Sequence, residues 1–127
     1  MFCNDKFEIG PLFNSVIHIK VLPGAEIELD DAKEIRKEVL GVANGNKYAI
    51  FLDGTETFEI TSEARKLISE IDNASQRIAI AFYIKSLANK LAGNFFINVN
   101  KPFTPTKIFS TKESALAWLN EEIERQK

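Results

Sequence analysis

Two short apolar segments, Tyr48 to Leu52 and Ile78 to Ile84, constrain the fold of this chain more than any other feature. Each has the length of a strand and lacks alternating polar residues, which is typical of a parallel strand covered on both faces. Asp53-Gly54 ends the first of them. Because segments with helical periodicity separate these strands, we expect an α/β protein with a largely parallel sheet.

Two further strands are expected near the N-terminus, around Lys6 to Ile9 and Ser15 to Leu22. Turn-forming residues separate them. In the second strand Ile17, Ile19 and Val21 share one face, whereas His18 and Lys20 share the other. This alternation predicts a strand with one dry side, and we expect His18 to be a surface side chain.

Four helices are predicted between and after the strands. The first has the capping-box spacing Asp31 to Glu34 and stops at Asn44-Gly45, and the last has a capping box at Ser110 and Glu113. The second begins near Thr61, and the third follows Ser86 as its cap. The apolar inner face of the second helix comprises Ala64, Leu67, Ile68 and Ile71.

With a short last strand at Lys107 to Phe109, the element order is β-β-α-β-α-β-α-β-α. This order predicts a single α/β domain over residues 1–127, with a mostly parallel, mixed five-stranded sheet and helices packed on it. Ligand sites in such sheets lie beyond the carboxyl ends of the parallel strands.

Charge is divided sharply along the chain. No Asp or Glu occurs between Asp72 and Glu113, and the segment Asn73 to Lys112 carries six Lys or Arg and five of the ten Phe. That segment therefore has a charge of +6, although the whole chain has a net charge of −2. A positive field without nearby carboxylates attracts anionic ligands or acidic protein surfaces.

The sequence lacks the residue patterns of most catalytic sites. His18 is the only histidine and Cys3 the only cysteine, so we expect no metal site and no cofactor. No phosphate-binding Gly-rich loop and no nucleophile elbow occurs. From the absence of these patterns we expect a protein without enzymatic activity. The N-terminal residues lack a secretory pattern and no window is apolar enough to span a membrane, so we expect a cytoplasmic protein.

Asp53 occupies the place that a phosphoacceptor aspartate has in the receiver domains of two-component signalling. Such a site also needs an acidic pair after the first strand, where this chain has Val21-Leu22-Pro23. We therefore interpret Asp53 as a strand-end turn residue.

The third helix and the loop after it contain most of the candidate binding residues. Leu87, Leu91 and Phe95 form one apolar ridge, and Ala88, Ala92, Phe96 and Val99 form the next. We expect Phe95 and Phe96 to be mostly core, with excess apolar area left for self-association, a protein partner or a lipid interface. The candidate partner or ligand surface comprises Lys85, Ser86, Lys90, Phe95, Phe96, Lys101 and Phe103. Nucleic-acid binding is not expected, because the protein is acidic overall and these aromatic residues are not on strands.

The element order and the segment FLDGTETFEITSEARKLI resemble the STAS superfamily, the fold of anti-sigma factor antagonists and of the cytoplasmic tails of sulfate transporters. The region from Gly93 to Leu119, with GNFF, NKPFTPTKIF and ALAWL, resembles the bacterial SpoIIAA-like group. Family antagonists carry Asp-Ser-Ser-Gly at the start of the second helix, where a serine is phosphorylated. The matching stretch here is Ile60-Thr61-Ser62-Glu63, so Ser62 corresponds to that serine.

The resemblance implies a non-enzymatic regulatory or protein-interaction module. Ser62 and Thr61 are then either phosphoacceptors or simple helix caps. The alternative that the resemblance leaves open is a carrier of lipid or of a small apolar ligand, or a peripheral membrane protein with anionic lipid headgroups near Lys85, Lys90 and Lys101.

Overall fold

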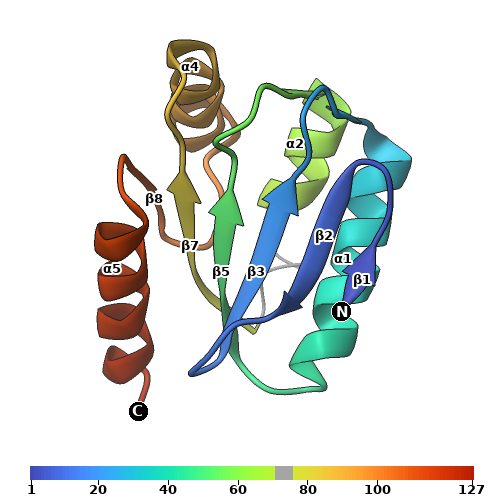
Figure 1. The fold of residues 1–127 in the computed structure, drawn as a ribbon. Helices are drawn as coiled ribbons and strands as arrows, with labels where there is room; N and C mark the ends of the chain where they lie inside the picture. Colours follow the sequence, from blue (N-terminus) through green and yellow to red (C-terminus); the bar gives the residue numbers. More distant parts are fainter. Residues whose placement is uncertain (71–75) are drawn as a thin grey trace.

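A computed structural model describes residues 1–70 and 76–127. Within them, six strands form one sheet in the order β1-β2-β3-β5-β7-β8 (Figure 1). The antiparallel strands at one edge are β1 (Phe2–Cys3), β2 (Phe7–Pro11) and β3 (Val16–Val21). Strands β3, β5 (Tyr48–Asp53), β7 (Arg77–Tyr83) and β8 (Thr106–Phe109) are parallel to one another. The predicted α/β class and mixed sheet are confirmed.

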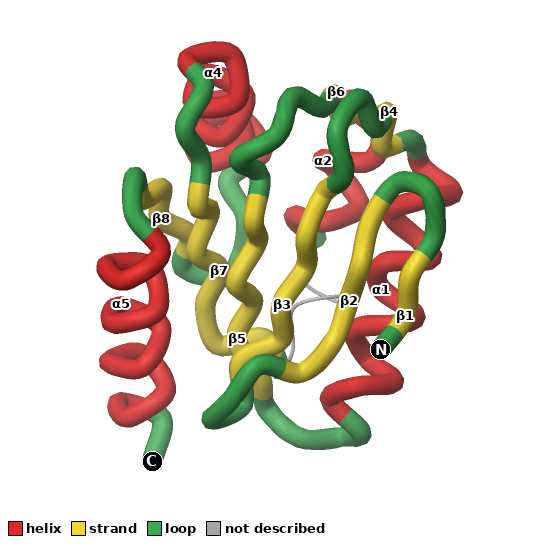
Figure 2. The backbone as a smooth tube through the Cα atoms, in the orientation of Figure 1, coloured by secondary structure: helices red, strands yellow, loops and turns green. Residues whose placement is uncertain are grey.

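The expected number of five strands was too low. Strand β1 pairs with β2 at the sheet edge, and β4 (Glu26–Ile27) and β6 (Glu59–Ile60) form a separate two-stranded parallel sheet. Figure 2 shows β4 and β6 beyond the carboxyl ends of β3 and β5. Two-residue strands are too short to show a hydrophobic period, so the sequence gives no signal for these three.

Helices cover both faces of the large sheet. One face packs against α1 (Leu29–Ala43), α2 (Ser62–Ser69) and α4 (Leu87–Phe95), and α4 continues into a π-helical turn, η1 (Phe96–Asn100). The other face packs against α5 (Lys112–Arg125). Ile71, which we expected on the inner face of the second helix, lies outside the described residues.

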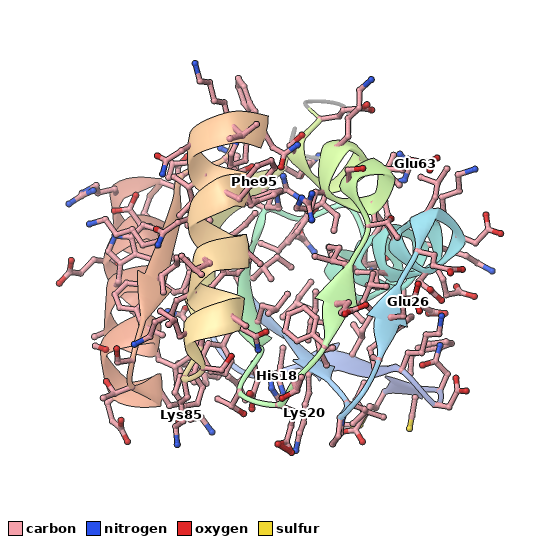
Figure 3. The ribbon with its side chains drawn as sticks, turned by 90° about the horizontal axis from the view of Figure 1, so that it is seen from above. His18, Lys20, Glu26, Glu63, Lys85 and Phe95 are labelled. Atoms are coloured by element: carbon pink, nitrogen blue, oxygen red, sulfur yellow. The ribbon has the colours of Figure 1, made fainter. Side chains whose placement is uncertain are left out.

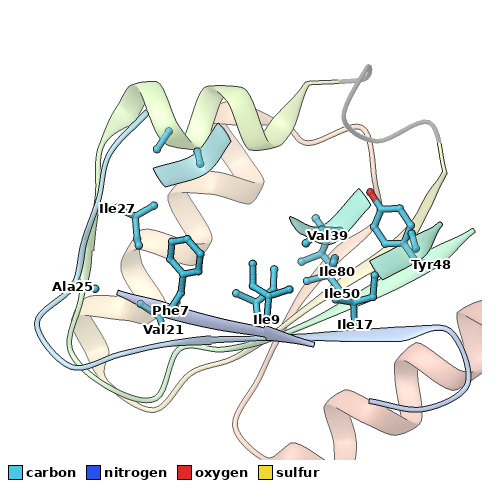
Figure 4. Packing of buried hydrophobic residues seen from close by; sticks show 14 residues of the cluster. Phe7, Ile9, Ile17, Val21, Ala25, Ile27, Val39, Tyr48, Ile50 and Ile80 are labelled. Atoms are coloured by element: carbon cyan, nitrogen blue, oxygen red, sulfur yellow. The ribbon is translucent and has the colours of Figure 1, made fainter. Parts of the chain in front are cut away.

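Residue size differs between the two faces of the sheet. The face beneath α1 and α2 carries large side chains, such as Phe7, Ile9 and Ile50 (Figure 4). The face beneath α5 carries Ala49, Ala79 and Ala81, which are essentially inaccessible to solvent, beside the buried ring of Phe51. Small residues let α5 approach the sheet closely, and the helix packs against it with the buried residues Ala115, Leu119 and Ile123.

The structure has the predicted kinds of helix cap, but the capping residues of α1 and α5 differ from those predicted. Helix α1 uses a capping box of Glu28 and Asp31 instead of Asp31 and Glu34, because the same acidic spacing occurs twice in succession. Helix α5 is capped by Thr111 and not by Ser110. The predicted stop of α1 is correct: Asn44 adopts the left-handed conformation, with φ of 50°.

Candidate functional site

Five large apolar side chains along α4, η1 and the following loop are exposed. Leu87, Leu91, Phe95, Val99 and Phe103 occur at every fourth position, and we call them the α4 stripe. Their exposed fractions range from 46% for Phe95 to 73% for Leu87. Large apolar residues that are grouped in this way on a surface are typical of an interaction site.

The stripe faces outward because the opposite ridge of α4 packs onto the sheet. The Phe96 ring is buried and lies 5.7 Å from the ring of Phe82 on β7. Gly93 allows a close approach, since a Cβ atom there would lie only 2.9 Å from Ile108 Cδ1 on β8. The buried Asn89 side chain donates hydrogen bonds to the carbonyls of Gly54 and Glu56. These contacts fix the orientation of α4.

Three lysines lie close to the stripe in the sequence. Lys85 and Lys101 are exposed, and Lys90 is half-buried. Among residues 1–70 and 76–127, none of the three takes part in an ion pair. Figure 3 shows Lys85 and Phe95 toward opposite ends of α4. The acid-free segment of the sequence is therefore also a surface whose lysine charges are not neutralised by close carboxylates.

The remaining predicted site residues have different environments. We expected Phe95 and Phe96 to be mostly core, but only Phe96 is buried, and it lines a cavity instead of the outer surface. Ser86 caps α4 by accepting a hydrogen bond from the Asn89 amide. Asp53 accepts hydrogen bonds from the amide and hydroxyl of Thr55, which is an Asx turn at the end of β5.

Thr61 and Ser62 at the start of α2 are not equivalent. The Thr61 side chain is the helix cap, because its Oγ1 accepts a hydrogen bond from the Ala64 amide at 3.2 Å. Ser62 is the first residue of α2 and is exposed, and its hydroxyl has no hydrogen bond to the described residues. The Ser62 side chain is thus accessible, and its match to the family phosphoacceptor stays a prediction from the sequence.

A cavity of about 120 Å³ lies between the sheet and the helices α1, α2 and α4. Most of its lining is apolar and includes Ile27, Ile60, Ile84 and Ala92 near the carboxyl ends of the strands. The charged residues that line it are Arg36, Arg65 and Arg77, and no acidic residue in the described part of the chain does so. Sequence reasoning missed this cavity, because a packing gap depends on how side chains from distant segments meet.

Arg77 on β7 and Arg65 on α2 differ in their hydrogen-bond partners. Arg77 donates from Nε to Thr104 Oγ1 and from Nη2 to the carbonyl of Ile68, and burial lowers its pKa. Arg65 donates from Nη1 to the carbonyl of Ile60, and its guanidinium lies 4.9 Å from the centre of the Phe95 ring. Arg65 thus links the cavity to the α4 stripe.

His18 lies on the α5 face of the sheet, away from the stripe and the cavity. The expectation of a surface side chain was wrong: His18 is half-buried and its ring stacks on Phe51 at 5.4 Å. Burial lowers the pKa of His18, which the Asp53 carboxylate partly opposes. Figure 3 shows His18 and Lys20 near each other and distant from Phe95. In residues 1–70 and 76–127, no three His, Cys, Asp or Glu side chains form a group that could hold a metal ion.

The sheet order, the helices on both faces and the exposed start of α2 define a SpoIIAA-like, STAS-type fold. A solved structure of an uncharacterised DUF3478-family protein from Shewanella loihica, described as SpoIIAA-like, matches with a TM-score of 0.67 and 16% identity, covering 94% of this chain and 98% of that one. The Bacillus cell fate determinant SpoIIAA in its phosphorylated form matches with a TM-score of 0.53 and 14% identity, covering 88% and 97%. The anti-sigma factor antagonist SpoIIAA in its unphosphorylated form matches with a TM-score of 0.55 and 15% identity, covering 90% of this chain and 97% of that one.

The chain belongs to the family DUF7793, a domain of unknown function, whose model matches residues 12–123. A comparison with curated proteins found no significant match. Of the helices in the described ranges, none has both the length and the apolar character needed to cross a membrane.

Proposed function

We propose that this protein is a non-enzymatic regulatory module that binds an acidic protein partner through the α4 stripe. The observation that carries the proposal is the exposure of the stripe beside lysines that form no ion pair within the described residues. A partner with an apolar centre and acidic residues around it complements both properties. Self-association of stripe with stripe is disfavoured, because it would bring the lysines of two copies together.

The SpoIIAA-like fold supports this proposal, since the anti-sigma factor antagonist of that fold is named for acting on another protein. The placement of the polar groups supports it as well. The hydroxyls of Ser86 and Thr61 serve as helix caps, and His18 lies on the face away from the stripe.

Ser62 is the proposed site of regulation. A phosphoryl group there would lie at the N-terminus of α2, which favours negative charge. It would also lie one helical turn from Arg65, whose guanidinium contacts Phe95 of the stripe. Attraction of Arg65 toward the phosphate would change the surroundings of Phe95. We expect Ser62→Asp to alter partner affinity and Ser62→Ala to leave it unchanged. Equal affinities of both variants and the wild type would contradict a role for Ser62.

The Leu91→Glu variant tests the docking surface. It places a carboxylate in the centre of the stripe, so we expect affinity for the partner to fall at least about tenfold. Leu40→Glu is the control, because Leu40 is also an exposed leucine on a helix, α1, and lies outside the stripe. Affinity is measured by calorimetry with a purified partner that was cross-linked through a photoreactive residue at position 91.

Two measurements distinguish a protein partner from the other candidates for binding the stripe, which are a second copy of the chain and a lipid surface. Sedimentation that shows a dimer sensitive to Leu91→Glu would indicate self-association instead. Flotation with anionic vesicles that depends on Leu91 and Lys90 would indicate a lipid surface. Equal partner binding by the Leu91→Glu and Leu40→Glu variants would reject the stripe as the docking surface.

The cavity favours a second candidate function, a carrier or sensor of a small apolar ligand. Its lining is mostly apolar, and the part of it at Leu52, Phe82 and Ile84 lies at the carboxyl ends of parallel strands, the usual place of ligand sites in α/β folds. Hexan-1-ol tests this function, because its neutral chain probes the apolar space alone. We expect saturable binding by the wild type and none by Ala92→Leu, in which the longer side chain fills the cavity.

A further inference from the structure

Arg65 has donors that the described chain leaves without acceptors. Its Nη1 is engaged by the carbonyl of Ile60, and one face of its guanidinium is covered by Phe95. Its Nε is buried and has no hydrogen-bond partner, and the described residues offer none to Nη2 either. A buried donor without an acceptor is unfavourable, and none of residues 1–70 and 76–127 supplies an acceptor to this edge of the guanidinium.

No carboxylate of the described chain occupies that edge. The ion pairs within residues 1–70 and 76–127 join Lys6 to Asp31 and two pairs near the end of α5. The Nε and Nη2 groups of an arginine form a planar fork whose spacing matches the two oxygens of a carboxylate. The missing acceptor is therefore of the kind that an anionic ligand supplies.

The space beside Arg65 sets the size of such a ligand. The cavity that Arg65 lines has a volume of about 120 Å³. An apolar cavity of roughly 150 Å³ accepts benzene, which has six carbon atoms. The cavity thus fits an aliphatic chain of about four to six carbons, and its largely apolar lining excludes a polar one.

We propose that the cavity binds a short-chain aliphatic carboxylate, with its carboxylate on the Nε and Nη2 edge of Arg65 and its chain among the apolar side chains of α2, α4 and the sheet. This inference rests on the second function proposed above and adds the charge and length of the ligand. It also gives Arg65 a part in both sites, since the same guanidinium contacts Phe95 in the α4 stripe.

Calorimetric titration of the full chain with butanoate, pentanoate and hexanoate tests the proposal. We expect saturable binding whose affinity rises about fourfold per added methylene, the value for burying one such group. Hexan-1-ol should bind at least about tenfold more weakly than hexanoate, because it lacks the charge-assisted hydrogen bonds. Arg65→Lys should lose about tenfold in hexanoate affinity while its hexan-1-ol affinity stays within about twofold, since lysine keeps the charge but not the fork.

Lys66→Ala is the control for unspecific attraction of anions, because Lys66 is exposed on α2 beside Arg65 and does not line the cavity, and it should leave hexanoate affinity unchanged. Hexanoate and hexan-1-ol binding with equal affinity, or hexanoate affinity that is equal in Arg65→Lys and the wild type, would overturn the carboxylate assignment but leave a ligand cavity. Absence of saturable binding of both compounds to the wild type would overturn the assignment and the second proposed function together. Neither result bears on the partner surface, which Leu91→Glu tests separately.

Discussion

His18 shows how neighbouring charges and burial act on a single residue. Burial lowers its pKa, Asp53 and Glu8 oppose this effect, and Lys112 and Lys20 add to it. The folded protein therefore binds a proton on His18 less readily than the unfolded chain does. The associated stability is complete above the unfolded pKa of about 6.5 and is lost as the pH falls from there through the lower folded pKa.

We predict that the free energy of unfolding decreases as the pH is lowered from 8 to 5, and that His18→Phe removes most of this decrease. His18 is the only histidine, and carboxylates titrate mainly near pH 4, so the window isolates the imidazole. Phenylalanine keeps a ring that can stack on Phe51. Urea denaturation at each pH measures the effect, and an equally steep slope in the variant would contradict it.

The sequence predicted the strand of His18 but not its environment. Alternation placed Ile17, Ile19 and Val21 on one face, and all three are buried. The stacking of His18 on Phe51 depends on the register between β3 and β5, which pairs these two residues directly. Register is set by the packing of whole strands, so it cannot be read from one strand alone.

At the scale of elements, helix identity was predictable because amphipathic periods extend over several turns. The exact caps were less predictable, since acidic and hydroxyl residues occur in adjacent positions, as at Ser110 and Thr111. The outward exposure of the α4 stripe also needed the structure. The predicted ridge of Ala88, Ala92, Phe96 and Val99 is divided in the structure: Phe96 is buried, whereas Ala88 and Val99 are exposed. The helix packs on the sheet through Gly93 and Phe96, which contact Ile108 and Phe82.

The start of α2 gives a prediction about two adjacent hydroxyls. Thr61→Ala should destabilise the protein by about 1 kcal/mol, because it removes the acceptor for the Ala64 amide. Ser62→Ala is the matched control and should change stability by no more than about 0.5 kcal/mol, since Ser62 is exposed and caps nothing. Chemical denaturation of both variants measures the difference. A larger loss for Ser62→Ala than for Thr61→Ala would show that the cap was assigned to the wrong residue.

At the scale of the whole molecule, the two faces of the sheet are packed differently. The α5 face is closed by one helix over three alanines and the buried ring of Phe51, whereas the opposite face encloses a cavity among three helices. The charge division of the sequence predicted lysines without close carboxylates, and the lysines beside the α4 stripe form no ion pair within residues 1–70 and 76–127. That this surface binds a partner stays a proposal. The cavity had no counterpart in the sequence, because it is the small difference between the volume enclosed by the elements and the volume of their side chains.

The cavity lowers stability, which gives the last prediction. At about 24 cal/mol per Å³, an empty volume of this size costs about 3 kcal/mol. Ala92→Leu adds apolar atoms at its wall, so we expect the free energy of unfolding to rise by about 1–2 kcal/mol. Ala88→Leu is the control, because Ala88 is exposed on the same helix and adds the same atoms outside the cavity.

Both variants are compared by urea denaturation, and Ala88→Leu should stay within about 0.5 kcal/mol of the wild type. A loss of stability in Ala92→Leu alone would mean that the space beside α4 is already filled, and it would remove the basis for a ligand there. A gain in stability together with loss of hexan-1-ol binding would show that one empty space both lowers the stability of the fold and holds the ligand. Filling that space stabilises the protein and removes the binding site.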